Sequence, residues 1–304
     1  MAEPEGKKYR IEPAQWWLII FVCASICASV LYRYLVGAKY SHSAAMFEGI
    51  PALLAIVLAL TPKAKTVTGG IMKGITLTLL VIAPLLGEGY LCIRMAAPLF
   101  YVVGLAIGIP VDIAKKKARG GATLSCMIIL LLPFCLEGVV PQLTFSRGQT
   151  VEVTKIVDSP APRVEEALAE SPRIGMQLPG FLRIGFPHPL EANGHGLEVG
   201  AQRAILFSGA EGDPAGWLVM RIAKRRPGFA RFETTSDSSK LTQWILWDAS
   251  EVEWTPVDAT HTRVTWRIHF ERQLDPAWYF TPWERGAVRL AAGYLIDANA
   301  GEQR

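Results

Sequence analysis

The chain has 304 residues, is 51% hydrophobic, and has a mean hydropathy of +0.26 and a formal net charge of +4. Residues 1–142 carry 13 Lys and Arg against 7 Asp and Glu, whereas residues 143–304 carry 18 against 20. Because the excess positive charge belongs to short segments between apolar runs, it does not form a nucleic-acid-binding face, and no nucleic-acid partner is expected.

The N-terminal half consists of long apolar runs separated by short basic segments. A helix that crosses a bilayer needs about 20 predominantly apolar residues. The first candidate begins with Trp16 and Trp17, which suit the membrane interface, and no convincing signal-peptide cleavage site follows it. We therefore predict an α-helical membrane bundle over residues 1–142 with about five transmembrane helices: 15–37, 43–61, 71–92, 95–113 and 122–142.

The distribution of basic residues predicts how these helices are oriented. If the N-terminus is cytoplasmic, ten Lys and Arg residues fall in inside segments and three fall in outside segments, which is a strong positive-inside bias. Five crossings place the C-terminal domain on the outer side, which is the periplasm if the protein lies in a bacterial inner membrane. If 71–113 crosses only once, there are four crossings and the domain is cytoplasmic.

Three Glu-Gly pairs lie near the predicted outer ends of these helices, at Glu48, Glu88 and Glu137, and Arg94 is close to the second. Carboxylates at membrane depth are costly and often mark ion or substrate pathways. The three glutamates and Arg94 are therefore candidates for a membrane polar cluster. The simpler alternative, which we favour, is that each glutamate caps a helix end in the headgroup region.

Motifs for metal, nucleotide or nucleophilic chemistry are absent from the sequence. The five cysteines all lie in the N-terminal half, without the spacing of a metal site. GxSxG, HExxH, P-loop and GxGxxG motifs are missing. We expect no metal and no cofactor, and we assign no catalytic residue. The stretch FPHPLEANGHG, with His188, Glu191 and His195, leaves acid–base chemistry open.

Residues 143–304 have the pattern of a soluble domain. A strand is predicted at 150–158, a helix follows from Pro160, and an irregular stretch rich in Gly and Pro precedes further strands at 198–208, 216–225, 229–235, 243–255 and 261–273. The last strand is the clearest. In TRVTWRIHFER the apolar residues Val264, Trp266, Ile268 and Phe270 alternate with polar ones, which is typical of an antiparallel strand with one covered face.

A long terminal helix is predicted from Thr281. Thr281 at the N-cap, Pro282 at the first helical position and Glu284 two positions later fit a capping box. Leu290, Ala291 and Tyr294 fall on one face, together with Ala287 and Leu295. Because this face contains small residues, we expect a gap between the helix and the sheet.

The segments VEVTKIVDSPAPRVEEAL and TRVTWRIHFERQLDPAWYF, with the terminal helix, resemble the START/Bet v 1-like (SRPBCC) superfamily, which includes polyketide cyclases and lipid-transport proteins. The resemblance covers about residues 148–300 and implies an α+β helix-grip domain, an antiparallel sheet with a long C-terminal helix. It also implies a cavity for a hydrophobic ligand, with these candidates in its wall: Val264, Trp266, Ile268, Phe270, Leu290, Ala291 and Tyr294.

Three functions follow from these patterns. The first is membrane-anchored binding or transfer of a lipid or polyketide-like ligand, with the lipid bilayer and a small hydrophobic molecule as partners. The second is a cyclase or dehydratase-type enzyme acting on an aromatic or polyketide substrate. The third is a transporter or sensor in which the glutamate-lined bundle is the active part. Seven of the nine tryptophans lie in the C-terminal half, where they fit either ligand contact or core packing.

Overall fold

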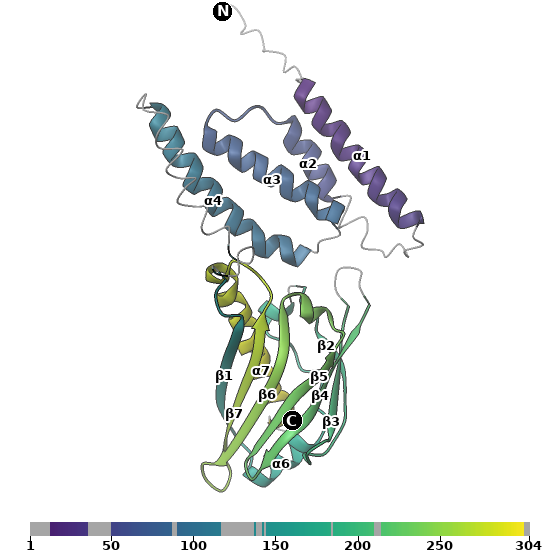
Figure 1. The fold of residues 1–304 in the computed structure, drawn as a ribbon, viewed down its shortest axis with the longest axis vertical. Coiled ribbons are helices and arrows are strands. Elements are labelled where there is room, and N and C mark those ends of the chain that lie inside the picture. The colour runs from purple at the N-terminus through teal and green to yellow at the C-terminus, as the bar shows by residue number, and fades with distance from the viewer. Residues whose placement is uncertain are drawn as a thin grey trace, which may run out of the picture. The chain divides into compact units, whose positions relative to one another are not determined.

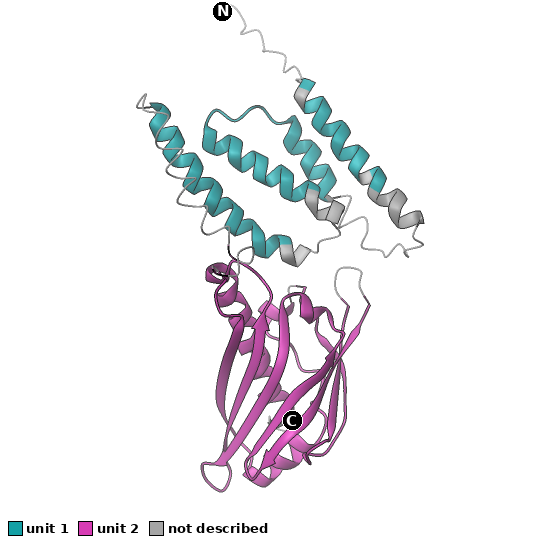
Figure 2. Ribbon diagram, in the orientation of Figure 1, with its two compact units in different colours: residues 1–131 teal, residues 132–304 magenta. Residues whose placement is uncertain are grey.

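The computed structural model describes residues 13–35, 50–86, 90–116, 137, 142, 144–183, 185–209 and 214–300. The chain forms two compact units, residues 1–131 and residues 132–304 (Figure 2). Glu137 therefore belongs to the second unit.

The described part of the first unit is helical (Figure 1). Its helices are α1 (Pro13–Leu35), α2 (Ile50–Leu60), α3 (Val67–Leu86) and α4 (Tyr90–Lys116). α2 packs on α1 and α3, and α3 packs on α4. Val22, Ala52 and Ala55 form a small buried cluster with apolar side chains of α3.

The contact between α3 and α4 depends on two glycines. In the α4 sequence GLAIG, a Cβ at Gly104 would meet a side chain of α3 at 2.6 Å, and a Cβ at Gly108 would lie 2.7 Å from the Cα of Thr68. One turn further on, the Asp112 carboxylate accepts hydrogen bonds from the backbone N–H groups of Val67 (2.7 Å) and Thr68 (3.0 Å). Asp112 thus satisfies free N–H groups at the start of α3.

Four of the five predicted apolar segments coincide with described helices, but five membrane spans are not confirmed. Among the described residues, one segment, Ile93–Lys116, is long and apolar enough to cross a membrane. α2 has 11 described helical residues, or about 16 Å at 1.5 Å per residue, which is short of a bilayer core. The predicted span 122–142 lies almost wholly outside the described residues.

The second unit contains a seven-stranded antiparallel sheet in the order β1-β7-β6-β5-β4-β3-β2. The strands are β1 (Gly148–Val157), β2 (Pro189–Asn193), β3 (Gln202–Phe207), β4 (Gly216–Arg226), β5 (Phe229–Asp237), β6 (Ile245–Pro256) and β7 (Thr262–Arg272). Two short 3₁₀ helices, η3 (Gly180–Arg183) and η4 (Lys240–Gln243), and the helix α6 (Ala161–Ala169) lie between strands. The predicted strands are confirmed within a few residues, except that β2 was not anticipated in the irregular stretch.

The helix α7 (Ala277–Ala300) packs against β1, β7 and α6 (Figure 1). This antiparallel sheet with a long C-terminal helix confirms the predicted helix-grip arrangement. The predicted start was wrong, because α7 begins four residues before Thr281 and Pro282 lies inside it. The capping box does not form. Glu284 is instead buried, and its Oε1 accepts a bond from the backbone N–H of Leu274 at 3.3 Å.

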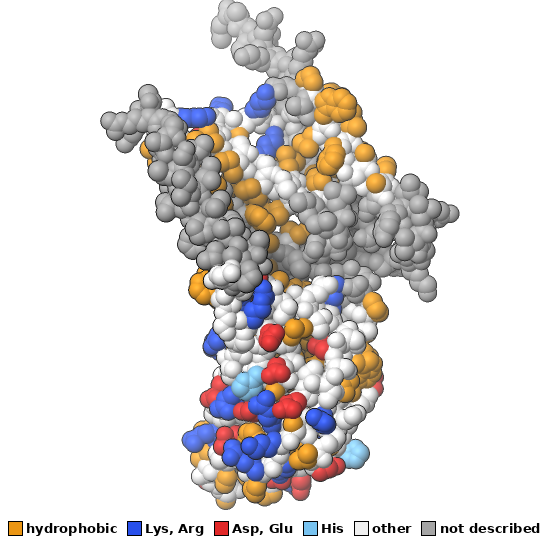
Figure 3. All heavy atoms as spheres, in the orientation of Figure 1, with side chains coloured by type: hydrophobic (Ala, Val, Ile, Leu, Met, Phe, Trp, Pro, Cys, Tyr) orange, Lys and Arg blue, Asp and Glu red, His pale blue; other side chains and the backbone are white. Residues whose placement is uncertain are grey.

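The two faces of the sheet differ as the alternation in β7 predicts. Val264, Ile268 and Phe270 are at most 1% exposed. On the opposite face, Arg267 donates to Glu152 of β1 and to Glu251 of β6, each at 2.9 Å. Figure 3 shows Lys, Arg, Asp and Glu side chains interspersed over the second unit.

Candidate functional site

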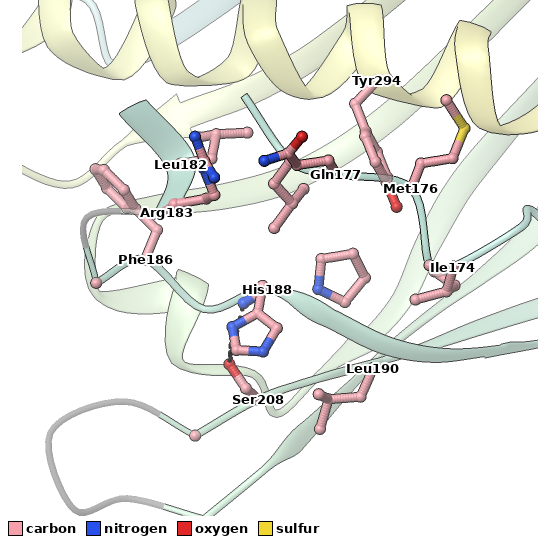
Figure 4. Close-up of a pocket in the computed structure, with 15 residues that line it drawn as sticks. Ile174, Met176, Gln177, Leu182, Arg183, Phe186, His188, Leu190, Ser208 and Tyr294 are labelled. Carbon is pink, nitrogen blue, oxygen red and sulfur yellow. Dashed lines mark hydrogen bonds between the residues drawn. The ribbon is translucent and has the colours of Figure 1, made fainter. Parts of the chain in front are cut away.

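A cavity of about 670 Å³ lies in the second unit beside α7, between the irregular segment 174–190 and the end of β3. Tyr294 points from α7 toward this cavity, and His188 and Ser208 lie on its other side (Figure 4). Several wall residues are exposed to solvent, which makes the cavity an open pocket. Its apolar wall is formed by Ile174, Met176, Leu178, Leu182, Phe186, Pro189 and Leu190.

Two hydrogen bonds hold the chain just before the irregular segment. The N–H of Arg173 donates to the carbonyl of Ala298 in α7 at 3.2 Å, and the hydroxyl of Ser171 donates to the carbonyl of Gly194 at 2.5 Å. Gly194 has φ +108°, and a Cβ there would collide with the carbonyl oxygen of Gln202. Only glycine fits that backbone and that space.

Arg203 fixes the region beneath the segment. Its guanidinium is buried and donates to the carbonyls of Leu168 (2.8 Å) and Ala169 (2.7 Å) at the end of α6, and to those of Gly194 (2.6 Å) and Gly196 (3.1 Å). Burial lowers the pKa of Arg203 from its usual value. A cation at the C-terminus of a helix is favourable because the last carbonyls there lack intrahelical partners. Arg203 thus ties the end of α6 to the loop that contains Gly194 and Gly196.

The polar groups of the pocket come from four places in the chain. The ring Nδ1 of His188 and the Oγ of Ser208 are 3.0 Å apart, and the backbone N–H of His188 also donates to that oxygen at 3.0 Å. The Ser208 hydroxyl thus accepts the His188 N–H and can donate its own hydrogen bond to Nδ1 of the ring. Burial raises the pKa of Tyr294, and a hydrogen bond with the backbone of Gly175 partly offsets that rise. Gln177 adds an exposed amide.

The pocket wall contains one permanently charged side chain, Arg183, and none of its residues is Asp or Glu. General acid–base catalysis by His188 would gain from a carboxylate that orients the ring. Among the described wall residues there is none.

The structure places the predicted cavity residues in two groups. Tyr294 lies in the wall of this pocket. Val264, Trp266, Ile268 and Phe270 are buried in β7, at most 5% exposed, and are not in the wall. Leu290 and Ala291 are half-buried on α7 and are also outside the wall. Fully buried positions of α7 are instead Val288, Ala292 and Ile296, each one position after a residue of the predicted face.

The predicted membrane polar cluster is only partly visible. Glu48 and Glu88 lie outside the described residues, so their convergence stays a prediction. Arg94 lies on α4 with an exposed side chain. The Glu137 carboxylate is buried and accepts hydrogen bonds from Arg272 and from the backbone N–H of Ala277, both at 2.8 Å.

Arg272 is the centre of a buried polar network at the start of α7. It is fully buried and also donates to the carboxylate of Asp275 at 2.5 Å, to which Arg147 contributes a second ion pair at 2.7 Å. Burial alone would raise the pKa of Asp275, but the bonds from the two arginines bring it below its usual value. This network joins Glu137 to the first turn of α7, so it serves the architecture of the unit.

A chain of aromatic rings lies next to the pocket. Phe186, in the pocket wall, has its ring centroid 5.3 Å from that of Phe181 and 5.8 Å from that of Trp244. Phe181 stacks on Trp283 at 6.1 Å, and Trp283 approaches Tyr279 at 6.3 Å. Such pairs add about 0.5–1.5 kcal/mol each beyond area burial. They fix one end of the pocket against α7 and η4.

Sequence reasoning missed most of this pocket. Its wall comes from the stretch SPRIGMQLPGFLRIGFPHPL, which has no regular periodicity. The one available signal was the density of large apolar residues within a Gly- and Pro-rich stretch, which is unusual for a solvated loop.

No protein-family model matches the chain, and no curated protein matches it. Solved structures that resemble it cover about half of the chain. The di-domain ARO/CYC BexL from the BE-7585A biosynthetic pathway is 15% identical over 50% of this chain and 45% of its own length, with a TM-score of 0.33. The chain thus spans less than half of BexL.

Two plant proteins are similar in the same way. Truncated norcoclaurine synthase from Thalictrum flavum is 12% identical over 52% of this chain and 97% of its own, with a TM-score of 0.35. The major latex-like protein 151 from Panax ginseng is 14% identical over 49% of this chain and 99% of its own length, with a TM-score of 0.29. These identities and scores are too low to assign a ligand or an activity to this chain.

Proposed function

We propose that the C-terminal unit binds a small hydrophobic or amphipathic molecule in the pocket beside α7, and that the N-terminal half anchors this unit to a lipid bilayer. The single observation that carries the proposal is the pocket itself. Its volume of about 670 Å³ lies within the range of about 300–1,000 Å³ that is typical of small-molecule sites. Its mostly apolar wall with a few polar groups is also typical of such sites.

The surface of the described helices supports membrane anchoring. α4 packs its glycine face on α3, while Val102, Leu105, Ile109 and Ile113 on that helix are between 41% and 60% exposed. A soluble helix turns its apolar stripe inward, so an apolar outer face favours contact with lipid. Gly104 and Gly108 form a GxxxG motif, which is common where membrane helices pack closely together. Figure 3 shows further apolar side chains on the surface of the first unit. Those exposed on α1 and α2 include Trp17, Phe21, Leu53 and Leu54.

Multi-pass insertion, the bacterial inner membrane and a periplasmic C-terminal unit are parts of the same proposal. The positive-inside bias of the loops supports the orientation. Anchoring has a physical advantage for a protein of this kind. A hydrophobic ligand is scarce in water, and a tether raises the effective concentration of the pocket near the ligand's source.

Partly filling the pocket should weaken ligand binding. Leu190 lies in the wall and is 49% exposed, so Leu190→Trp can place a large ring in the pocket without overpacking the core. We expect the full-length protein in lipid nanodiscs to bind the neutral fluorescent probe 1-aminoanthracene. Leu190→Trp should weaken that binding at least about tenfold, equivalent to ~1.4 kcal/mol.

Val257→Trp is the matched control. Val257 is 47% exposed, close to the value for Leu190, but lies beyond the end of β6 and outside the pocket wall. It should leave probe binding unchanged after the signal of empty nanodiscs is subtracted. Equal binding by wild type and Leu190→Trp would contradict the proposed site.

A further inference from the structure

Arg183 brings an uncompensated positive charge to the pocket. It ends η3 within the wall, its side chain is exposed, and among the described residues its guanidinium makes no hydrogen bond and no ion pair. Six other arginines of this unit are engaged, whereas Arg163, Arg221 and Arg289, like Arg183, have no side-chain partner among the described residues. Arg147, Arg203, Arg225, Arg231, Arg267 and Arg272 each bind a carboxylate or carbonyl.

Nothing in the described pocket wall neutralises this charge. Its other polar side chains are Gln177, His188, Ser208 and Tyr294, and each of them can donate a hydrogen bond. A guanidinium presents a fork of donors that matches a carboxylate. The apolar side chains Met176, Leu182 and Leu190 lie in the same wall (Figure 4).

We infer that the preferred ligand class is an amphipathic acid: one hydrocarbon or aromatic body in the apolar part of the pocket and one anionic head paired with Arg183. This inference rests on the proposed function and specifies which ligands it takes. The head would gain a charge-assisted hydrogen bond, which is shorter and stronger than a neutral one. A neutral amphiphile of the same length would gain only the apolar contacts.

The experiment compares dodecanoate with dodecanol as competitors of 1-aminoanthracene bound to full-length protein in nanodiscs of neutral lipid. The two molecules share a chain length and differ in the head. Arg183→Gln should weaken dodecanoate binding roughly 3- to 10-fold, a modest loss because the pair is partly solvated. It should weaken dodecanol binding and probe binding by clearly less than it weakens dodecanoate binding. Arg183→Lys should retain part of the preference, and added salt should weaken binding of the acid alone.

Arg173→Gln is the matched control, because Arg173 is an exposed arginine just before the irregular segment and lies outside the pocket wall. Arg173→Gln should leave the binding of both dodecanoate and dodecanol unchanged. If Arg183→Gln weakens the binding of dodecanoate and dodecanol equally, or weakens neither, the anionic-head inference is overturned while the proposed function stays intact. If the probe does not bind, or binds Leu190→Trp as tightly as wild type, both the proposed function and this inference are overturned.

Discussion

The buried carboxylates at the start of α7 show how differently two glutamates can be used within one small region. Glu137 is paired with the fully buried Arg272 and with the N–H of Ala277. Glu284 is equally buried, but its Oε2 has no hydrogen-bond partner among the described residues. A buried carboxylate without a strong partner is costly when it is charged.

Glu284 should make the stability of the second unit depend on pH. Burial raises the pKa of Glu284 from an ordinary 4.5 to about 7, against weaker opposing effects of the Leu274 and Gln273 backbone and of Arg272. Between these two values the folded state holds a proton that the unfolded state has lost. Stability contributed by this group is therefore present below about pH 4.5 and is lost as the pH rises through about 7, by at most about 3 kcal/mol.

The measurement is thermal or denaturant unfolding of wild type and Glu284→Gln from pH 5 to pH 8.5. The difference in unfolding free energy between the two should grow in favour of the variant as the pH rises. Taking the difference cancels the titration of distant groups. A difference that is flat with pH would contradict the raised pKa.

At the scale of elements, the packing of α3 on α4 depends on the absence of side chains at two positions. Gly108→Leu would drive a side chain into the backbone of Thr68, whose Cα would lie 2.7 Å from the new Cβ. We expect a loss of about 1–3 kcal/mol from overpacking and a lower unfolding temperature of the helical unit, measured by circular dichroism in detergent.

Gly74→Leu is the control for this change, because a Cβ at Gly74 meets nothing within 4 Å. Both substitutions raise helix propensity by a similar amount. Their difference therefore reports the helix contact. Equal unfolding temperatures for the two variants would show that α3 and α4 do not pack through Gly108.

Comparison with the sequence shows which elements could be predicted. Alternation in TRVTWRIHFER identified β7 and its buried face, because a strand with one covered side has a period of two. The start of α7 was misplaced because Thr281, Pro282 and Glu284 imitate a capping box, whereas the helix begins at Ala277, whose backbone N–H donates to the buried Glu137 carboxylate.

The pocket could not be predicted from periodicity. Its wall is an irregular segment held by backbone bonds to α7 and β3, such as that from Arg173 to Ala298. Contacts of this kind leave no pattern in the sequence. Tyr294 was predicted because apolar residues recur with helical spacing around it, whereas Arg183 and His188 lie in a stretch whose apolar residues show no regular spacing.

At the scale of the whole molecule, the chain joins helices with an exposed apolar surface to a helix-grip unit with an open pocket. These two observations support the proposed tethered binding of a hydrophobic ligand. The alternative of a glutamate-lined transport path depends on Glu48 and Glu88, which lie outside the described residues, and Glu137 is engaged by Arg272.

The most direct test of the central claim is photolabelling of the full-length protein in nanodiscs with a dodecanoic acid that carries a diazirine at the chain end, followed by peptide mapping. The account predicts labelled peptides from residues 174–190 and from the part of α7 that contains Tyr294, with labelling lost in Leu190→Trp and kept in Val257→Trp. Labelling confined to residues 1–131, with none in the C-terminal unit, would contradict it.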